Sequence, residues 1–358
     1  DKVVINVAVT EKSTGEYGAT AGYSTTDGIL GEVSLTERNF LGRGQYLRAA
    51  IGASQAGRTF DFSFTEPRFM GLKVSAGIDA YHRINEETTS TFYGSQATGG
   101  QLRAGIPLTS DLSSTVFAGL ERKIITDVND NPTYQSSLVV DGQEFNKAYI
   151  GYTLTWNGLD DVKKPTEGLY ATFTQQYIGW DHNLVKSEAR ARYFVPVVED
   201  SGIVASLKGQ AGVINDLSGN GVHAVEAFNP GTQLIRGFEG RGLGPRLQSG
   251  EYLGATMYAG LSAEISFPIP AVPESYGLSG ALWADAAWVD GLPRIGTGSA
   301  ALSNVDAGSQ DAPWRTSIGA SLIWDSPFGP LRGDFAHVLN KSTSDRTQVF
   351  QLSLQTLL

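Results

Sequence analysis

A period-two alternation of apolar and polar residues, repeated along almost the whole chain, is the feature that most constrains the fold. From Glu16 onward, segments of about ten residues carry this alternation, and clusters of Gly, Asp, Asn and Pro separate them. Residues 72–81 read Leu-Lys-Val-Ser-Ala-Gly-Ile-Asp-Ala-Tyr, with apolar side chains at every second position. Successive side chains of a strand point to opposite faces, so each segment predicts a strand with one apolar and one polar face.

The polar face of one segment indicates the environment that it meets. Residues 186, 188, 190 and 192 are Lys, Glu, Arg and Arg, and a strand would place all four on the same face. A charged side chain that faces hydrocarbon near the bilayer midplane costs ~2–4 kcal/mol, so these residues should line an aqueous interior. An array of soluble β-sandwiches is the alternative, but sandwiches seldom place four charged residues on an inner face. We therefore predict an all-β fold, a 16-stranded antiparallel transmembrane β-barrel over residues 16–358.

Composition argues against several other classes of protein. The net charge of −10 and the pI near 5.0 leave no basic surface for phosphates, so nucleic acid is not an expected partner. No apolar run approaches the ~18 residues that a membrane helix needs, so a membrane would have to be crossed by strands. The absence of cysteine excludes disulfides, thiolate nucleophiles and cysteine-ligated metals.

The predicted connections alternate between tight turns and long loops. Outer-membrane barrels keep short turns on the periplasmic side and long loops outside, so this alternation orients the barrel. The tight turns are residues 41–44, 109–112, 199–202 and 326–330, and the long connections are residues 84–95, 128–145, 214–252 and 290–313. The longest connection should therefore start from the extracellular rim.

The longest connection contains a run of glycines around three arginines, between Pro230 and Arg246. Glycine permits backbone conformations that are closed to other residues, so this loop can fold back on itself into the lumen. Arg236, Arg241 and Arg246 offer planar donors for carboxylates, which predicts an acidic partner. A flexible glycine-rich surface loop is the simpler alternative for this stretch taken alone.

Two acidic residues that should face the lumen follow the loop directly. In residues 257–268 the apolar positions leave Glu264 on the polar face, and in residues 278–289 they leave Asp285 there. These two segments should be neighbouring strands. An arginine folded into the lumen could therefore contact both carboxylates, and a partly dry interior would strengthen such charge-assisted hydrogen bonds.

The loop core Ile235-Arg236-Gly237-Phe238 resembles the Val-Arg-Gly-Phe/Tyr signature of the BamA-type outer-membrane assembly-factor family. The resemblance implies that the loop arginine pairs with the inward acids that match Glu264 and Asp285. Residues 283–287 have alanine at Ala287, where the family pattern aromatic-x-Asp-x-Gly has glycine. Residues 31–44, 160–168 and 314–334 also resemble the family, so the resemblance covers essentially the whole chain.

The resemblance implies a domain organisation and a function. Residues 1–15 are expected to be the remnant of the last periplasmic POTRA-type repeat, and residues 16–358 the transmembrane barrel. The implied function is the folding and insertion of other outer-membrane proteins, in the outer membrane of a Gram-negative bacterium. Unfolded β-barrel clients, periplasmic or lipoprotein assembly subunits and outer-membrane lipid are the expected partners. A two-partner-type secretion transporter of the same superfamily is the alternative, and a general diffusion porin is a third possibility.

A lateral seam between the first and last strands is the expected site of client entry, since closure of the barrel joins the chain ends. Gly18 and Gly22 weaken the first strand, expected at residues 17–24. Phe350, Leu352 and Leu354 give the last strand, expected at residues 347–357, the alternation of the family's terminal β-signal. The chain departs from that signal near its end, where Gln355 replaces the expected glycine and Leu358 the expected aromatic residue.

No enzymatic activity is predicted. The histidines are scattered at His82, His182, His223 and His337, and no Gly-x-Ser-x-Gly motif is present. The glycines at 240–244 lack the strand-to-helix context of a phosphate site. We therefore expect no catalytic residues, no metal and no cofactor; a membrane-embedded lipase with a Ser–His pair is the remaining enzymatic alternative.

Overall fold

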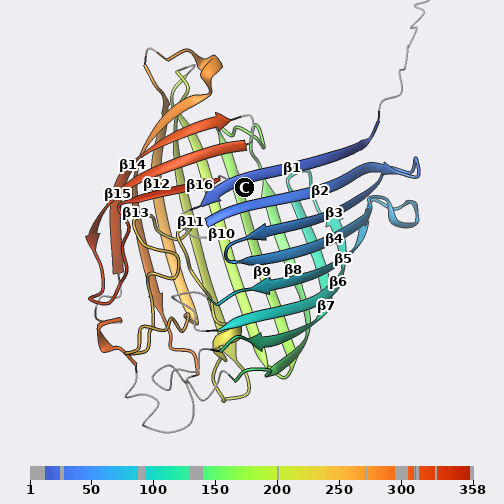
Figure 1. The fold of residues 1–358 in the computed structure, drawn as a ribbon. Helices are drawn as coiled ribbons and strands as arrows, with labels where there is room; N and C mark the ends of the chain where they lie inside the picture. The colour runs from blue at the N-terminus through green and yellow to red at the C-terminus, as the bar shows by residue number, and fades with distance from the viewer. Residues whose placement is uncertain are drawn as a thin grey trace, which may run out of the picture.

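The computed structural model describes residues 13–24, 28–87, 93–128, 140–199, 201–270, 272–294, 305–309, 311, 314–326 and 329–354. Within them the chain forms sixteen strands in one sheet, and each strand is antiparallel to the next along the sequence. Figure 1 shows the strands as the wall of a barrel. The predicted sixteen-stranded antiparallel barrel is therefore confirmed. Residues 1–12, on which most of the predicted POTRA-type remnant falls, lie outside the described residues.

The strand bounds follow the period-two segments closely. The strands are β1 (Gly15–Ser24), β2 (Gly28–Phe40), β3 (Gln45–Ser54), β4 (Gly57–Glu66), β5 (Ser75–Asn85), β6 (Gly94–Pro107), β7 (Leu112–Thr126), β8 (Glu144–Asn157), β9 (Gly168–Trp180), β10 (Leu184–Val198), β11 (Ile203–Asp216), β12 (Met257–Pro268), β13 (Leu278–Asp290), β14 (Trp314–Ser326), β15 (Gly329–Asn340) and β16 (Phe350–Leu354). In the described part of the chain, four short 3-10 helices lie between strands: η1 (Phe69–Gly71), η2 (Ala224–Glu226), η3 (Glu274–Tyr276) and η4 (Ala307–Ser309). None of the helices in the described part of the chain is long and apolar enough to cross a bilayer.

Two strands differ most from the bounds expected for them. The segment expected at 72–81 is β5, which begins only at Ser75, because the chain first forms η1 with Met70 at a φ of 54°. The last strand, expected at 347–357, is β16 over Phe350–Leu354, and residues 355–358 lie outside the described part of the chain. Thr347 belongs instead to an isolated bridge with Phe238 of the long loop.

Alternation sorts the side chains of the wall into an outer apolar face and an inner polar face. On β12, Leu261 and Ile265 are 55% and 47% exposed, while Tyr258 and Glu264, at positions of the opposite parity, are buried. Exposed apolar side chains repeat on most of the other strands in the same way. This is the arrangement that a barrel in lipid requires, since the exposed face meets hydrocarbon and the inner face meets water or protein.

The buried apolar core lies between the inner wall and the connection from β11 to β12, residues 217–256, which we call the long loop. The loop residues Val222, Phe228, Leu234, Ile235, Phe238 and Leu243 pack in one cluster with Ile178, Leu184, Ile214, Tyr258, Ala287 and Val289 of the wall. Phe238 is fully buried and Ile235 is 1% exposed. The long loop is therefore packed inside the barrel as a folded element.

Candidate functional sites: the loop anchor and the seam

Arg236 of the long loop lies against the inner faces of β12 and β13, next to both predicted acids. Its Nε and Nη2 atoms donate to the Asp285 carboxylate at 2.8 and 2.6 Å, and its Nη1 donates to Glu264 at 2.6 Å. The backbone N–H of Arg236 also donates to Asp285, at 3.0 Å. The guanidinium stacks on the ring of Trp283, with 3.9 Å between the guanidinium carbon and the ring centroid. A planar cation is thus fixed on several sides, which lysine could not reproduce.

The other three residues of the Ile235–Phe238 motif set the backbone conformation at Gly237 and bury two apolar side chains. Gly237 has a φ of 90°, and a Cβ built there would lie 3.0 Å from the Cβ of Ala336 and 3.1 Å from Val338. Only glycine fits both the conformation and the space. On either side of the Arg236–Gly237 pair, Ile235 and Phe238 are buried in the apolar cluster of the lumen.

Two residues of β15 that the sequence analysis did not single out complete the site. Arg332 donates to Glu264 at 2.7 and 3.0 Å and to Asp334 at 2.8 Å, and Asp334 also lies 3.8 Å from the Arg236 guanidinium. Arg236, Glu264, Asp285, Arg332 and Asp334 form what we call the loop anchor. The signal in the sequence was the pair of charges two residues apart on the inward face of β15.

The seam is the second predicted site. β1 and β16 stand at the two ends of the hydrogen-bonded strand order. The two strands lie next to each other, but no hydrogen-bonded ladder joins them within the described residues. β16 pairs with β15 through only five residues, whereas β1 pairs with β2 through ten. Even complete pairing with β16 would therefore leave about half of the free edge of β1 unpartnered in the described chain.

The residues predicted at the seam lie on these two strands. Gly18 faces Ser34 of β2, where an added Cβ would lie 2.6 Å from the serine hydroxyl, and Gly22 pairs with Leu30. On β16, the rings of Phe350 and Phe335 are 4.9 Å apart, and Leu352 and Leu354 pair with Gly333 and Leu331. Gln355 and Leu358 lie outside the described residues.

Residues 39–356 match the Omp85 superfamily domain. The chain belongs to the Omp85 superfamily. It is 27% identical over 360 residues to the outer membrane protein assembly factor BamA of Neorickettsia risticii, covering 98% of this chain and 46% of that protein. It is also 27% identical to BamA of Neisseria meningitidis, covering 99% of this chain and 48% of that protein. The chain thus spans about half the length of these relatives.

Solved structures give the same fold. The crystal structure of BamA from Haemophilus ducreyi lacking POTRA domains 1–3 matches 96% of this chain and 70% of that one, with a TM-score of 0.80 and 21% identity. CdiB from Acinetobacter baumannii matches 95% of this chain and 59% of that one, with a TM-score of 0.56 and 12% identity. As a member of the Omp85 superfamily, this chain is a barrel of the Gram-negative outer membrane.

Arg246, another arginine of the long loop, donates to backbone carbonyls and not, within the described residues, to the carboxylate partner that was predicted for it. Arg246 is 2% exposed, and its guanidinium donates to the backbone carbonyls of Gly250 and Arg241. It holds one turn of the loop to another, because carbonyl oxygens left free by the glycine-rich backbone need donors. Arg241 contributes its carbonyl to this contact.

One buried acid of the long loop is not neutralised by a neighbouring cation. Glu251 is 3% exposed, and its Oε2 atom has no hydrogen-bond partner. Burial raises the pKa of Glu251 to about 7, because the ionised form loses its hydration without gaining a partner. The charge state of the loop therefore changes near neutral pH.

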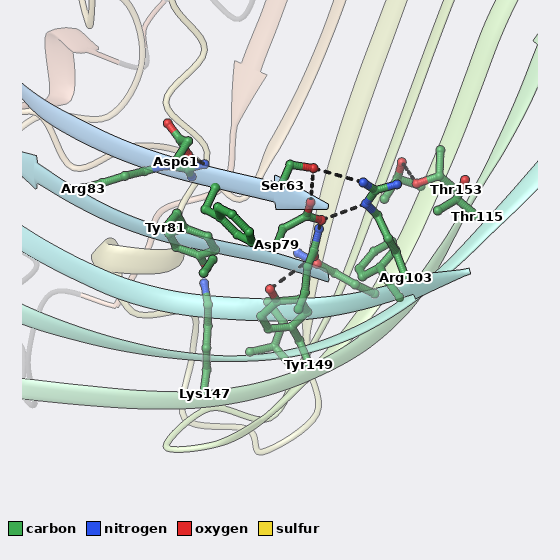
Figure 2. A pocket seen from close by; sticks show the side chains of 17 residues that line it. Asp61, Ser63, Asp79, Tyr81, Arg83, Arg103, Thr115, Lys147, Tyr149 and Thr153 are labelled. Atoms are coloured by element: carbon green, nitrogen blue, oxygen red, sulfur yellow. Dashed lines mark hydrogen bonds and ion pairs between the residues drawn. The ribbon is translucent and has the colours of Figure 1, made fainter. Parts of the chain in front are cut away.

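A polar cavity of about 650 Å³ occupies the lumen side of β4 to β9. Its charged side chains are paired within the wall. Asp79 accepts hydrogen bonds from Ser63 at 2.7 Å and from Arg103 at 2.9 Å (Figure 2), and Arg83 lies 3.6 Å from Asp61. Asp61 and Asp79 are thus neutralised by arginines of the wall. The remaining charged residue of the lining, Lys147, pairs with Glu121 of β7 and with Glu226 of the long loop.

Proposed function

We propose that this chain is the barrel part of an outer-membrane protein assembly factor, and that it inserts clients through the seam between β1 and β16. The unpaired edge of β1 is the observation that carries this proposal. A strand edge with free N–H and C=O groups is a template for an incoming strand, which can pair by β-augmentation. Client insertion then needs no covalent chemistry and no cofactor.

The loop anchor supports this function over transport through the lumen. Arg236 and the apolar residues beside it hold the long loop inside the barrel, where it occupies space that a secreted chain would need. A transporter of the same superfamily would have to release that loop during each passage. An assembly factor can keep the anchor closed while only the seam opens.

We also expect the seam to need less free energy to open than any other pair of neighbouring strands. Five residue pairs join β16 to β15, and the glycines of β1 present no side chain to a neighbour. Few cross-strand contacts give a small free energy of local opening, so this edge should separate before any of the long strand pairs. Preceding periplasmic domains and lipoprotein subunits, which we also propose as partners, would deliver clients to it.

A disulfide across the seam tests the mechanism. The chain contains no cysteine, so one engineered cysteine on β1 and one on β16, with Cα atoms within ~7 Å, can pair without side products. In the full-length protein reconstituted in vesicles, the locked seam should stop the folding of an added β-barrel client, and a reductant should restore it. A control disulfide between Gly52 of β3 and Thr59 of β4, which already pair, should leave client folding unchanged.

The outcomes separate the two candidate functions. Client folding at the normal rate with a fully locked seam would refute lateral opening. If the locked protein instead passes a soluble partner chain across the membrane, the transporter is the correct function.

A further inference from the structure

A second cluster of buried charges holds the long loop on a different part of the barrel wall, which no predicted site includes. Glu226, at the end of η2, is 7% exposed. Its carboxylate lies 3.2 Å from the Lys147 ammonium of β8 and 3.6 Å from the Lys123 ammonium of β7. Lys123 also donates to the backbone carbonyl of Val225 at 3.0 Å. The wall therefore contacts both the Glu226 side chain and the loop backbone beside it.

The contacts continue into the wall as a chain of alternating charges. Lys147 lies 3.0 Å from Glu121 of β7, and Glu121 accepts a hydrogen bond from the Tyr81 hydroxyl at 2.5 Å. Figure 2 shows Lys147 rising beside Tyr81 at the edge of the polar cavity. The Nε2 atom of His182 lies 4.0 Å from Glu226, and Phe145 stacks on the His182 ring.

Without the loop, this part of the wall carries an unbalanced positive charge. Lys123, Lys147 and Glu121 carry +1 +1 −1, a net charge of +1, and Glu226 brings the sum to zero. Burial alone would raise the pKa of Glu226, but Lys123 and Lys147 outweigh burial and hold that pKa at about 2. Two buried lysines so close together repel one another unless an anion lies between them.

The loop anchor has the opposite sign. On β12, β13 and β15 the residues of the loop anchor are three acids, Glu264, Asp285 and Asp334, and one cation, Arg332, and the loop adds the positive Arg236. The partly buried cations Arg192 of β10 and Lys208 of β11 also interact with this group, but neither forms a salt bridge with its acids in the described residues. The long loop thus presents an anion at residue 226 to a cationic wall and a cation at residue 236 to an anionic wall. Exchanging the two ends would bring like charges together at both.

We propose that two separate charged contacts hold the long loop: Arg236 on β12 to β15, which we call the Arg236 lock, and Glu226 on β7 and β8, which we call the Glu226 lock. Because the two residues have opposite charges, the contacts also fix the direction of the loop across the lumen. Glu226 is then the positioning residue for the first half of the loop. This inference does not rest on the proposed client insertion, because it concerns only how the loop is held.

Cysteine labelling in the folded barrel can follow each lock separately, since the chain has no cysteine of its own. Ala227→Cys reports on the Glu226 lock and Leu234→Cys on the Arg236 lock; the two residues are 6% and 4% exposed. The probe is a water-soluble maleimide, and its reaction rate follows the population in which the thiol is exposed. Each variant is first shown to keep the heat-modifiable mobility of a folded barrel.

Glu226→Gln should speed labelling of the Ala227→Cys protein about tenfold and change labelling of the Leu234→Cys protein by less than about twofold. Arg236→Ala should do the reverse. Glu239→Gln is the matched control, because Glu239 is an exposed acid of the same loop and its loss should change neither rate. If Glu226→Gln fails to fold, Lys123→Met tests the same lock while it leaves the Lys147–Glu226 pair in place, and should speed only the Ala227→Cys reaction.

Two results would overturn the proposal. Unchanged labelling of Ala227→Cys in folded Glu226→Gln and Lys123→Met proteins would show that Glu226 holds nothing. Equal acceleration at both reporters in Glu226→Gln would show one cooperative anchor in place of two locks.

Discussion

Removal of the Arg236 side chain should be among the most damaging single changes in this barrel, and the structure indicates which contact dominates the loss. In Arg236→Ala, Glu264 keeps its hydrogen bonds from Arg332, at 2.7 and 3.0 Å. Asp285 keeps only the backbone N–H of residue 236, because no other cation lies within salt-bridge distance of it in the described residues. The cost is therefore mainly that of one buried carboxylate left without its cation, ~3–5 kcal/mol.

A double-mutant cycle measures the free-energy cost of leaving the Asp285 carboxylate without its cation. If the stranded Asp285 charge carries the loss, then Asp285→Asn in the Arg236→Ala background should recover part of it, and the coupling energy between the two changes should be ~2–3 kcal/mol. Unfolding by urea in lipid vesicles gives the free energies. Arg190→Ala is the control, because Arg190 faces the lumen with 57% of its side chain exposed and lies 3.5 Å from Glu188. Its loss should cost ~1 kcal/mol or less.

Additive effects of Arg236→Ala and Asp285→Asn would refute this reasoning. So would a loss for Arg236→Ala no larger than that for Arg190→Ala, since both would mean that the anchor contributes no more than an exposed ion pair.

Two further changes in the long loop have opposite expected signs. The raised pKa of Glu251, about 7 against an ordinary 4.5, means that ionisation opposes folding as the pH rises from 4.5 to 7, by at most about 3 kcal/mol above that range. Glu251→Gln should therefore raise the urea midpoint at pH 8 and leave it unchanged at pH 4, and an equal effect at both pH values would contradict the assignment. Gly237→Ala should destabilise the loop by ~1–3 kcal/mol, because of the positive φ and the close Ala336 side chain. Gly231→Ala, where an added Cβ meets nothing within 4 Å, is the control, and equal losses in the two would exclude a steric cause.

The wall of the barrel could be predicted from the sequence because each strand carries its own signal. Period-two alternation depends only on which face of a strand meets lipid, so it survives without knowledge of the partners. The prediction of residues 257–268 as a strand matches β12, and the inward positions of Glu264 and Asp285 follow from parity alone. The late start of β5 was missed because η1 and Met70 form a local turn that no alternation reveals.

The completion of the loop anchor could not be predicted in the same way. Arg332 and Asp334 read as charges on the inward face of one strand, but the sequence does not show which opposite face they meet. Two strands separate β12 from β15 in the sheet, and the curvature of the wall brings Arg332 within 2.7 Å of Glu264. That contact depends on closure and strand tilt, which are properties of the whole barrel.

The contacts of Glu226 are even harder to predict from the sequence, because its partners Lys147 and Lys123 lie 79 and 103 residues earlier in the chain. No spacing rule joins an acid in a loop to lysines on β7 and β8. The contact depends on the path of the loop across the lumen, to which the apolar cluster around Phe238 and Ile235 also contributes. The wall is held by long ladders of backbone hydrogen bonds, whereas the loop is held by this cluster and by a few buried charges. Changes in the loop charges should therefore alter what fills the lumen well before they alter whether the barrel forms.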